Sequence, residues 1–337
     1  MKINKDELKK ALEIVKPGLA NRELQDQFTS FAFIEDKVVT YNDEISISHP
    51  VTGLGIYGAI RAEELYQLLS KLKNDEVNFE LSESEILLTC GRVKAGLRMQ
   101  QEILLPILKI DEKKGWIILP DNFLTALKFS AGSCSNDMSR PILTCVHITK
   151  NFVEGSDGYC VSKHKFDSSM KVSKPLLLPA SAVADIIKVQ PSSFIVEDAW
   201  VHFRNRNETV ISCRLFSEDA YPETDHLYKL EGQEIPFPKT ISDILDRAMV
   251  FSKRSHVTDE SITVSLGEKR IKISCKNELD SWFEEEANVK YSERELSFNI
   301  IPSLLQDILK QTNVCIIDSN KIKFSGDVWE YVAILKN

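Results

Sequence analysis

Apolar residues recur with helical spacing in three segments that lie far apart along the chain, at residues 6–19, 120–131 and 238–251. In each segment they tend toward positions i, i+3, i+4 and i+7, the spacing of a helix that packs by one face. The apolar faces consist of Leu8, Ala11, Leu12 and Val15, then Phe123, Leu124 and Leu127, then Ile241, Ile244, Leu245 and Ala248. Pro120 and Pro238 suit the first turn of a helix, where a missing N–H is tolerated. We therefore predict three related helices.

A second set of helical segments follows the first, at residues 61–69, 179–187 and 302–309. The starting positions of the first set are 114 and 118 residues apart, and those of the second set are 118 and 123 residues apart. The two sets therefore share nearly one period, and a fixed period is the sequence signature of a repeat architecture.

Many of the intervening residues alternate between apolar and polar, as half-buried strands do. Residues 77–81 place three apolar side chains on one face, and residues 270–274 place Ile271 and Ile273 on one face. In residues 200–203, Val201 and Phe203 are predicted to face away from His202.

These patterns predict an α+β chain built from three copies of one unit, each with two helices packed on antiparallel sheets. The charged stretch 109–115 and the polar stretch 221–233 are the candidate boundaries. We predict domains at residues 1–114, 115–230 and 231–337. The alternative is three unrelated α+β domains whose spacing agrees by coincidence.

Charge and hydropathy narrow the function classes. The net charge of −8 over 337 residues argues against a basic protein that coats nucleic acid, but it allows basic groups on an inner face. The charged first residues lack the apolar core of a signal peptide, and no apolar run approaches the ~18 residues of a membrane span. We expect a cytoplasmic protein.

The cysteines give no sign of a metal site or a disulfide framework. They are odd in number, scattered, and never spaced C-x-x-C. They are Cys90, Cys134, Cys145, Cys160, Cys213, Cys275 and Cys315. Several fall in strand-like runs, where a buried, reduced thiol is the ordinary state.

Enzyme motifs are weak in this sequence. Residues 53–58 (GLGIYG) have the G-x-G-x-x-G spacing and precede a helix, but the surrounding pattern is not a βαβ unit, so a flexible loop is the better interpretation. A hydrolase set of Ser156, Asp157, His147 and His164 is conceivable, although Asp157-Gly158 is better explained as a turn. We expect no cofactor, no metal and no catalytic activity.

Motifs along the whole chain resemble one family. Residues 139–144 (SRPILT) precede residues 154–159 (EGSDGY), and 177–179 (LLP), 214–216 (RLF), Tyr221-Pro222 and Phe298-Asn299 follow in order. This order is similar to that of the bacterial DNA sliding clamp, the beta subunit of DNA polymerase III. The family turn continues His-Arg-Leu where this chain has 159–161 (YCV), and the C-terminus also departs from the family ending. The resemblance is therefore to a phage or otherwise divergent clamp.

The resemblance implies a head-to-tail homodimeric ring around duplex DNA, in the cytoplasm of a bacterial or phage-infected cell. Such a protein is a processivity factor without catalytic activity that binds DNA without sequence preference and tethers a polymerase after a clamp loader has opened the ring. The alternative from another class is a repeat scaffold that binds proteins but no longer binds DNA.

In the family, helices line the hole, so cations near their later turns become candidate phosphate contacts. The candidates are Lys16, Arg22, Lys71, Lys73, Lys128, Lys188, Arg247, Lys253, Arg254 and Lys310. The alternative is that cations near helix C-termini only complement the helix dipole. Carboxylates such as Glu13, Asp185, Asp246 and Asp307 interrupt the set.

The resemblance also implies a partner-peptide cleft and a subunit contact. The matching cleft positions are Leu143, Ser156, Gly158, Tyr159, Val161, Pro222, Leu227, Asn299, Pro302, Ile322, Val332 and Ile334. An apolar cleft with a few polar groups is suited to peptide capture. The subunit contact is expected between Leu97 of one chain and Val250 and Phe251 of the other. For each of these apolar residues, ordinary core packing is the alternative.

Overall fold

The computed structural model describes residues 2–82, 84–111, 113, 115–217, 221–254, 260–318 and 320–335. Contacts divide the chain into two compact units. Unit 1 comprises residues 1–119 and 184–215, and unit 2 comprises residues 120–183 and 216–337. The predicted boundaries of three domains stay a prediction.

Unit 1 is built on one antiparallel sheet of twelve strands. Its order is β1 (Lys2–Asn4), β6 (Glu76–Leu81), β7 (Glu85–Cys90), β8 (Val93–Gln100), β5 (Gly58–Arg61), β2 (Ser30–Ile34), β3 (Lys37–Tyr41), β4 (Ile45–Pro50), β16 (Val210–Arg214), β15 (Trp200–Arg204), β14 (Ser193–Glu197) and β9 (Ile117–Ile118). The helices are α1 (Lys5–Val15), α2 (Ala62–Lys71) and, apart from its first residue, α4 (Val183–Val189).

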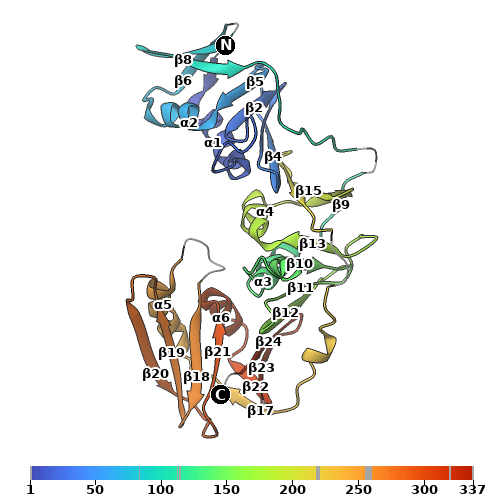
Figure 1. Ribbon diagram of the computed structural model, residues 1–337, viewed down its shortest axis with the longest axis vertical. Coiled ribbons are helices and arrows are strands. Elements are labelled where there is room, and N and C mark those ends of the chain that lie inside the picture. The colour runs from blue at the N-terminus through green and yellow to red at the C-terminus, as the bar shows by residue number, and fades with distance from the viewer. Residues whose placement is uncertain are drawn as a thin grey trace. The chain divides into compact units, whose positions relative to one another are not determined.

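Unit 2 contains an eight-stranded and a four-stranded antiparallel sheet (Figure 1). The larger has the order β13 (Leu176–Pro179), β10 (Cys145–Ile148), β11 (Phe152–Ser156), β12 (Cys160–Lys165), β24 (Trp329–Ile334), β23 (Lys321–Ser325), β22 (Val314–Asp318) and β17 (Gln233–Pro236). The smaller has the order β20 (Trp282–Asn288), β19 (Arg270–Lys276), β18 (Ile262–Gly267) and β21 (Leu296–Ile300). The helices are α3 (Phe123–Ala131), α5 (Ile241–Ser252) and α6 (Pro302–Leu309).

All six predicted helical segments are helical, and α1 illustrates why. Asn4 caps it by accepting hydrogen bonds from the backbone N–H groups of Asp6 and Glu7, which also place negative charge at the positive end of the helix dipole. The residues 16–18 (KPG) end it in a 3-10 turn. The predicted apolar face of Leu8, Ala11, Leu12 and Val15 is buried.

Three local predictions needed correction. Pro120 and Pro238 lie before their helices, where their carbonyl groups accept hydrogen bonds from Phe123 and Ile241, the first helical residues. Leu81 is 55% exposed because β6 ends there. His202 is buried, and its Nδ1 forms a hydrogen bond of 2.7 Å with Ser212 Oγ on the neighbouring strand. The prediction for residues 53–58 is confirmed: Gly53 and Gly55 lie in a loop, Gly58 begins β5, and the neighbours of β5 are antiparallel, so no βαβ unit is present there.

One arrangement of strands occurs three times. Four-stranded groups run in the orders β5-β2-β3-β4, β13-β10-β11-β12 and β21-β18-β19-β20. A second kind runs in the orders β1-β6-β7-β8, β9-β14-β15-β16 and β17-β22-β23-β24. The structure thus contains the threefold repeat that the sequence periods predict.

The repeats are joined by strand pairing at two places. In the first junction, β4 pairs with β16, and α1 and α4 lie on one side. In the second junction, β12 pairs with β24, and α3 and α6 approach each other. Each sheet is thereby continuous from one repeat into the next.

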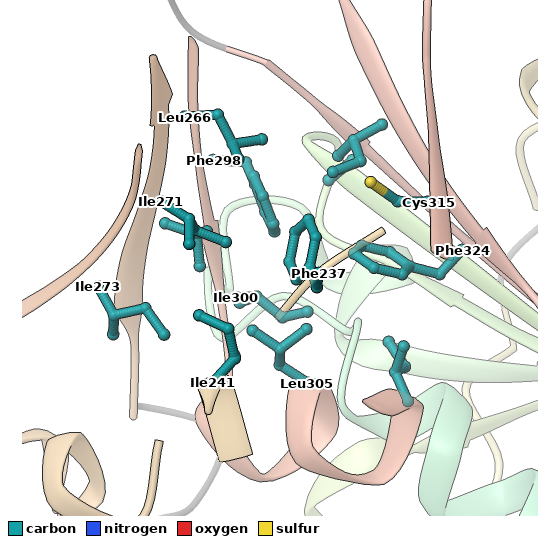
Figure 2. Close-up of a cluster of buried hydrophobic side chains, with 14 of the residues drawn as sticks. Phe237, Ile241, Leu266, Ile271, Ile273, Phe298, Ile300, Leu305, Cys315 and Phe324 are labelled. Carbon is teal, nitrogen blue, oxygen red and sulfur yellow. The ribbon is translucent and has the colours of Figure 1, made fainter. Parts of the chain in front are cut away.

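The third repeat has an extensive apolar core. Phe237, Phe298, Leu305 and Phe324 converge between its two sheets and α6, and each is at most 2% exposed (Figure 2). Burial of this much aromatic and aliphatic surface, at roughly 25 cal/mol per Å² of apolar area, is the main force that fixes the layers.

Candidate functional site

The candidate phosphate-binding cations of unit 1 lie at helix ends, as predicted. Lys16 follows α1 and lies 4.7 Å above the ring of Tyr66, while Lys71 and Lys73 lie at the end of α2. Arg22 is exposed in the loop after α1. Lys188 in the last turn of α4 forms an ion pair with Asp185 at 2.9 Å.

The candidate cations of unit 2 are more heavily compensated by carboxylates. Lys128 and Lys310 both contact Asp307 at 2.9 Å, and the pKa of Asp307 is lowered because these hydrogen bonds outweigh the opposing effect of burial. Arg247 binds Glu285 through two hydrogen bonds of 2.7 and 2.6 Å. Arg254 lies 3.8 Å from Glu278.

These ion pairs reduce the positive charge that was expected from the predicted DNA-binding cations. Five of the ten predicted cations (Lys128, Lys188, Arg247, Arg254 and Lys310) lie within ion-pair distance of a carboxylate. Sequence reasoning also missed Lys9 and Lys10 on α1, whose basic character was visible in residues 8–13 (LKKALE). Lys9 contacts Glu13 at 3.7 Å, and Lys10 is exposed.

The residues predicted for the subunit contact differ in exposure. Val250 is 67% exposed on α5. Phe251 is half-buried and stacks on Phe283 of β20, with ring centroids 5.7 Å apart. Leu97 on β8 is already buried within its own chain, at 7% exposed.

The second junction brings together the core of the predicted peptide cleft. Val161 and Val332 are register partners on β12 and β24. The backbone N–H of Ile334 donates to the carbonyl oxygen of Tyr159 at 2.8 Å. Tyr159 and Ile334 are 61% and 41% exposed, so this end of the junction presents an aromatic ring and an aliphatic chain at the surface.

A tight turn holds Tyr159 in place. Asp157 Oδ1 accepts hydrogen bonds from the backbone N–H groups of Tyr159 and Cys160, and Ser156 Oγ donates to the Cys160 carbonyl at 2.7 Å. Gly158 has φ +89°, and a Cβ there would lie 2.8 Å from Nη1 of Arg140. A side chain at position 158 is therefore both strained and crowded. Leu143 lies beside this turn and is buried.

The other predicted cleft residues are distributed over several elements. Ile322 is fully buried in the third core, which makes it a core residue and not a cleft wall. Asn299 lies on β21, where it pairs with Thr263 Oγ1, and Pro302 opens α6. Pro222 is exposed, and Leu227 packs beside Val161 and Val332.

A cluster of polar side chains on β10, β11 and β12 holds the segment 221–230 against the sheet. Sequence reasoning missed this cluster. Buried Glu154 contacts His147 Nδ1 at 2.8 Å and accepts a hydrogen bond from Thr224 Oγ1 at 2.6 Å. Buried Lys163 contacts Asp225 at 2.6 Å, and its ammonium lies 4.7 Å from the ring of Tyr228. The alternating polar residues of β11 and β12 were the only sequence signal for this cluster.

This cluster affects the residues of the predicted cleft. Because it fixes the segment, Tyr228 is buried against Val161 and Val332, and Leu227 and Leu230 pack beside them. Burial raises the pKa of the Tyr228 hydroxyl, and the Tyr228 ring packs against Val161 and Val332 beside the predicted cleft.

The hydrolase interpretation is not supported by the geometry. Ser156 Oγ contacts the Cys160 carbonyl, and His147 binds Glu154, so neither is arranged as nucleophile and base. All seven cysteines are free, and burial raises the pKa of Cys145 to about 11. Among the described residues, no group of three or more His, Cys, Asp or Glu side chains is placed to hold a metal ion, and no helix is long and apolar enough to span a membrane.

Comparison with known proteins gives a clear result at the level of structure alone. No family model matches the sequence, and no curated protein matches it. Among solved structures, the DNA polymerase sliding clamp of Bacillus subtilis matches with a TM-score of 0.76 at 17% identity, covering 100% of this chain and 98% of that one. The beta subunit from the DNA polymerase of Streptococcus pyogenes matches with a TM-score of 0.76 at 18% identity, covering 100% and 99%.

A third comparison agrees. The DNA polymerase III subunit beta of Pseudomonas aeruginosa matches with a TM-score of 0.75 at 15% identity, covering 100% of this chain and 99% of that one. The chain therefore has the sliding-clamp fold over its whole length, as the sequence predicted. The low identities extend this likeness to the fold alone.

Proposed function

We propose that this protein is a DNA sliding clamp, a non-catalytic accessory subunit that closes into a homodimeric ring around duplex DNA and tethers a replicative polymerase. A clamp loader is the expected agent that opens the ring, in the cytoplasm of a bacterial or phage-infected cell. The observation that carries the proposal is the set of sheet edges left open by the repeat.

The open edges match the two junctions already formed. In each junction, the strand that ends the first kind of group (β4 or β12) pairs with the strand that ends the second kind (β16 or β24). The remaining strands of these types are β20 in the third repeat and β8 in the first. Among the described residues, β20 pairs only with β19, and residues 93–98 of β8 pair only with β7. Pairing β20 of one chain with β8 of another repeats the same junction and closes a ring.

The two junctions within the chain suggest the register that we propose for the third. In both, the first residue of β4 or β12 that pairs across its own hairpin (Ser46 or Val161) lies opposite a residue of β16 or β24 (Ser212 or Val332). That residue is the third, counted from the turn, of those that pair across the partner's hairpin. By the same rule, counted from the β7–β8 turn, we propose that Trp282 of one chain lies opposite Ala95 of the next.

The charges of the two edges support this register. Residues 284–286 of β20 are three consecutive glutamates, whereas Arg92, Lys94 and Arg98 are exposed on and beside β8. The proposed register brings Arg92 opposite Glu285, although each of the three glutamates also contacts a cation of its own chain. Trp282 is 69% exposed and would become covered, which accounts for an indole left on the surface of a single chain.

A cross-linking experiment tests ring closure. In a chain with Ala95→Cys and Trp282→Cys, oxidation should give a covalent dimer on a non-reducing gel, because directly opposed residues bring their Cβ atoms to about 4.5–5.5 Å. Ala95→Cys with Asn288→Cys is the matched control, because position 288 lies several residues out of register. The unmodified chain controls for the native thiols. A monomeric mass by light scattering at all concentrations, with no specific cross-link, would contradict the proposal.

We further propose that Tyr159 and Ile334, with the wall made by Leu227 and Tyr228, form the surface where the polymerase binds through a short peptide. A peptide with a clamp-binding motif should bind with a lower affinity to Tyr159→Ala than to the native chain. Asp225→Ala should also weaken binding, because it releases the segment that positions Tyr228. Tyr57→Ala, another exposed tyrosine (57%), is the control. Unchanged affinity in both cleft variants would show that partners bind elsewhere.

The scaffold without DNA remains a second candidate because carboxylates neutralise half of the predicted cations. Lys253→Glu with Lys73→Glu discriminates the two functions. Both side chains are exposed, and a clamp should lose retention on DNA of any sequence when they are reversed. A scaffold should keep its peptide binding and show no DNA retention before or after the change.

A further inference from the structure

The first junction contains a pocket of about 890 Å³ that lies wholly within unit 1. Its walls come from α1, from the C-terminal end of α4 with the loop after it, and from the β15–β16 turn at residues 205–207. Ile47, His49 and Thr209 form part of its lining. This volume is typical of small-molecule sites, which span roughly 300–1,000 Å³.

In the second junction, aromatic side chains fill the space that corresponds to this pocket. His164 pairs with Trp329 there, and His49 in the first junction contacts Thr209 Oγ1 at 2.8 Å in the same register. Trp329 is therefore the counterpart of Thr209. Its indole lies 5.2 Å from the ring of Phe129 and is 2% exposed.

The helices extend the correspondence. Leu12 and Val15 are buried in α1, and Leu127 and Ser130 are buried in α3 with the same spacing. When the two helices are aligned on these residues, Ile14 corresponds to Phe129. An indole and a phenyl ring in the second junction are thus replaced by a hydroxyl and a butyl group in the first. The pocket occupies the space where the second junction holds two aromatic groups packed at a tilt.

The charges of the pocket favour an anion. Glu13 accepts a hydrogen bond from the Tyr66 hydroxyl at 2.7 Å and contacts Lys9, and Asp185 is paired with Lys188. Among the described residues, Lys10 and Arg206 have no ion-pair partner, and they stand on different walls of the same pocket. The positive charge that remains is therefore on α1 and on the β15–β16 turn.

We propose that this pocket binds a nucleotide, with the base lying on the apolar lining in the place of the missing aromatic rings and the phosphate held by Lys10 and Arg206. Ile14 is 37% exposed and offers most of the apolar surface, with Val189 beside it, and the side-chain amide of Asn207 is suited to the edge of a base. Arginine and lysine on two walls suit a phosphate better than a carboxylic partner group because both can donate to its several oxygens.

The ligand has two chemical sources, a free nucleotide and an unpaired nucleotide in a DNA strand. Calorimetric titration of the full chain with deoxyadenosine monophosphate, a ten-nucleotide oligothymidine, deoxyadenosine and inorganic phosphate separates them. Both phosphorylated nucleotide ligands should bind, and deoxyadenosine and phosphate alone should bind at least tenfold more weakly. A preference for the oligonucleotide assigns the site to DNA, and a preference for the monophosphate assigns it to the free nucleotide.

Three variants make the test specific. Arg206→Glu lies in an exposed turn, so it should leave the fold intact and weaken nucleotide binding at least tenfold. Ile14→Phe with Thr209→Trp copies the second junction into the first and should abolish binding. Lys239→Glu, an exposed cation outside the pocket, is the charge-matched control and should bind as the native chain does.

The outcomes are independent of ring closure because every pocket residue belongs to one chain. Native binding that persists in both Arg206→Glu and the filled variant would overturn the site. The absence of binding to the native chain at millimolar ligand would do the same. Failure of the Ala95 and Trp282 cross-link, by contrast, bears only on the clamp.

Discussion

The two junctions of this molecule share one backbone pattern and differ in how side chains fill it. Both pair a strand of one repeat with a strand of the next in the same register, and both place an Asp–Lys ion pair of 2.9 Å in the second helix. The second junction is packed by Phe129 and Trp329, whereas the first leaves a pocket at the corresponding positions. The comparison indicates that strand pairing specifies the architecture and that side-chain volume can vary once the pairing is fixed.

Removing the aromatic filler of the second junction should have the largest effect. Trp329→Thr copies the first junction into the second and should lower the free energy of unfolding of unit 2 by about 3–5 kcal/mol, because it leaves a cavity beside Phe129. Urea unfolding followed by circular dichroism measures this change. Thr209→Ala in the first junction is the matched control and should cost about 1 kcal/mol, the value of its hydrogen bond to His49. If Trp329→Thr and Thr209→Ala lowered the free energy of unfolding equally, the proposed difference in packing between the two junctions would be wrong.

The two equivalent histidines should give a smaller effect that depends on pH. Burial lowers the pKa of His49 and of His164, and for His164 a hydrogen bond to the Lys165 carbonyl partly opposes it. A lowered pKa in the folded state means that protonation favours unfolding. The stability from the neutral rings is therefore complete above the unfolded value of about 6.5 and is lost as the pH falls through the folded pKa.

NMR titration of the histidines tests whether their pKa values are lowered, and urea unfolding at several pH values tests whether stability falls with pH as predicted. His49→Gln should flatten the acid dependence of unit 1, and His164→Gln should flatten that of unit 2. A folded pKa above 6.5 for either histidine would show that burial is not the dominant influence.

The smallest effect should come from the helix pairs that flank the junctions. Glu13 is the counterpart of Lys128, so Lys128→Glu places a second carboxylate beside Asp307, as Glu13 stands near Asp185 in the first junction. The Lys128 side chain is 63% exposed, so solvent screening limits the loss to about 0.5–1 kcal/mol. High salt should reduce the difference from the native chain, and a loss that does not change with salt would point to packing instead.

Sequence periodicity was sufficient for the elements but not for the filling of the junctions. The faces of α1 and α5 follow directly from one apolar stripe each, because burial of a stripe is a local property of the sequence. In the sequence, Ile14 and Phe129 are both apolar residues of a predicted helix, and the pattern does not distinguish them. Only the pairing of β4 with β16 and of β12 with β24 shows that one of them lines a pocket and the other fills a core.

The candidate site was less predictable because its key contacts are long-range. Lys128 and Asp307 lie 179 residues apart, so no local pattern indicates that the predicted DNA-binding cation is already paired. Glu154 and Thr224 are likewise joined only by the fold. Ile322 was placed in the cleft by resemblance, and its burial in the third core follows from strand alternation on β23.

The central claim, a ring around DNA, is tested most directly by topological retention. The chain with Ala95→Cys and Trp282→Cys is assembled with circular plasmid, oxidised, and passed through gel filtration in high salt, which removes direct phosphate contacts. A covalent ring should elute with the circular plasmid and should be released when the plasmid is linearised or when the disulfide is reduced. Equal retention on circular and linear DNA would indicate ordinary surface binding, and no retention on circular DNA despite efficient cross-linking would contradict the clamp.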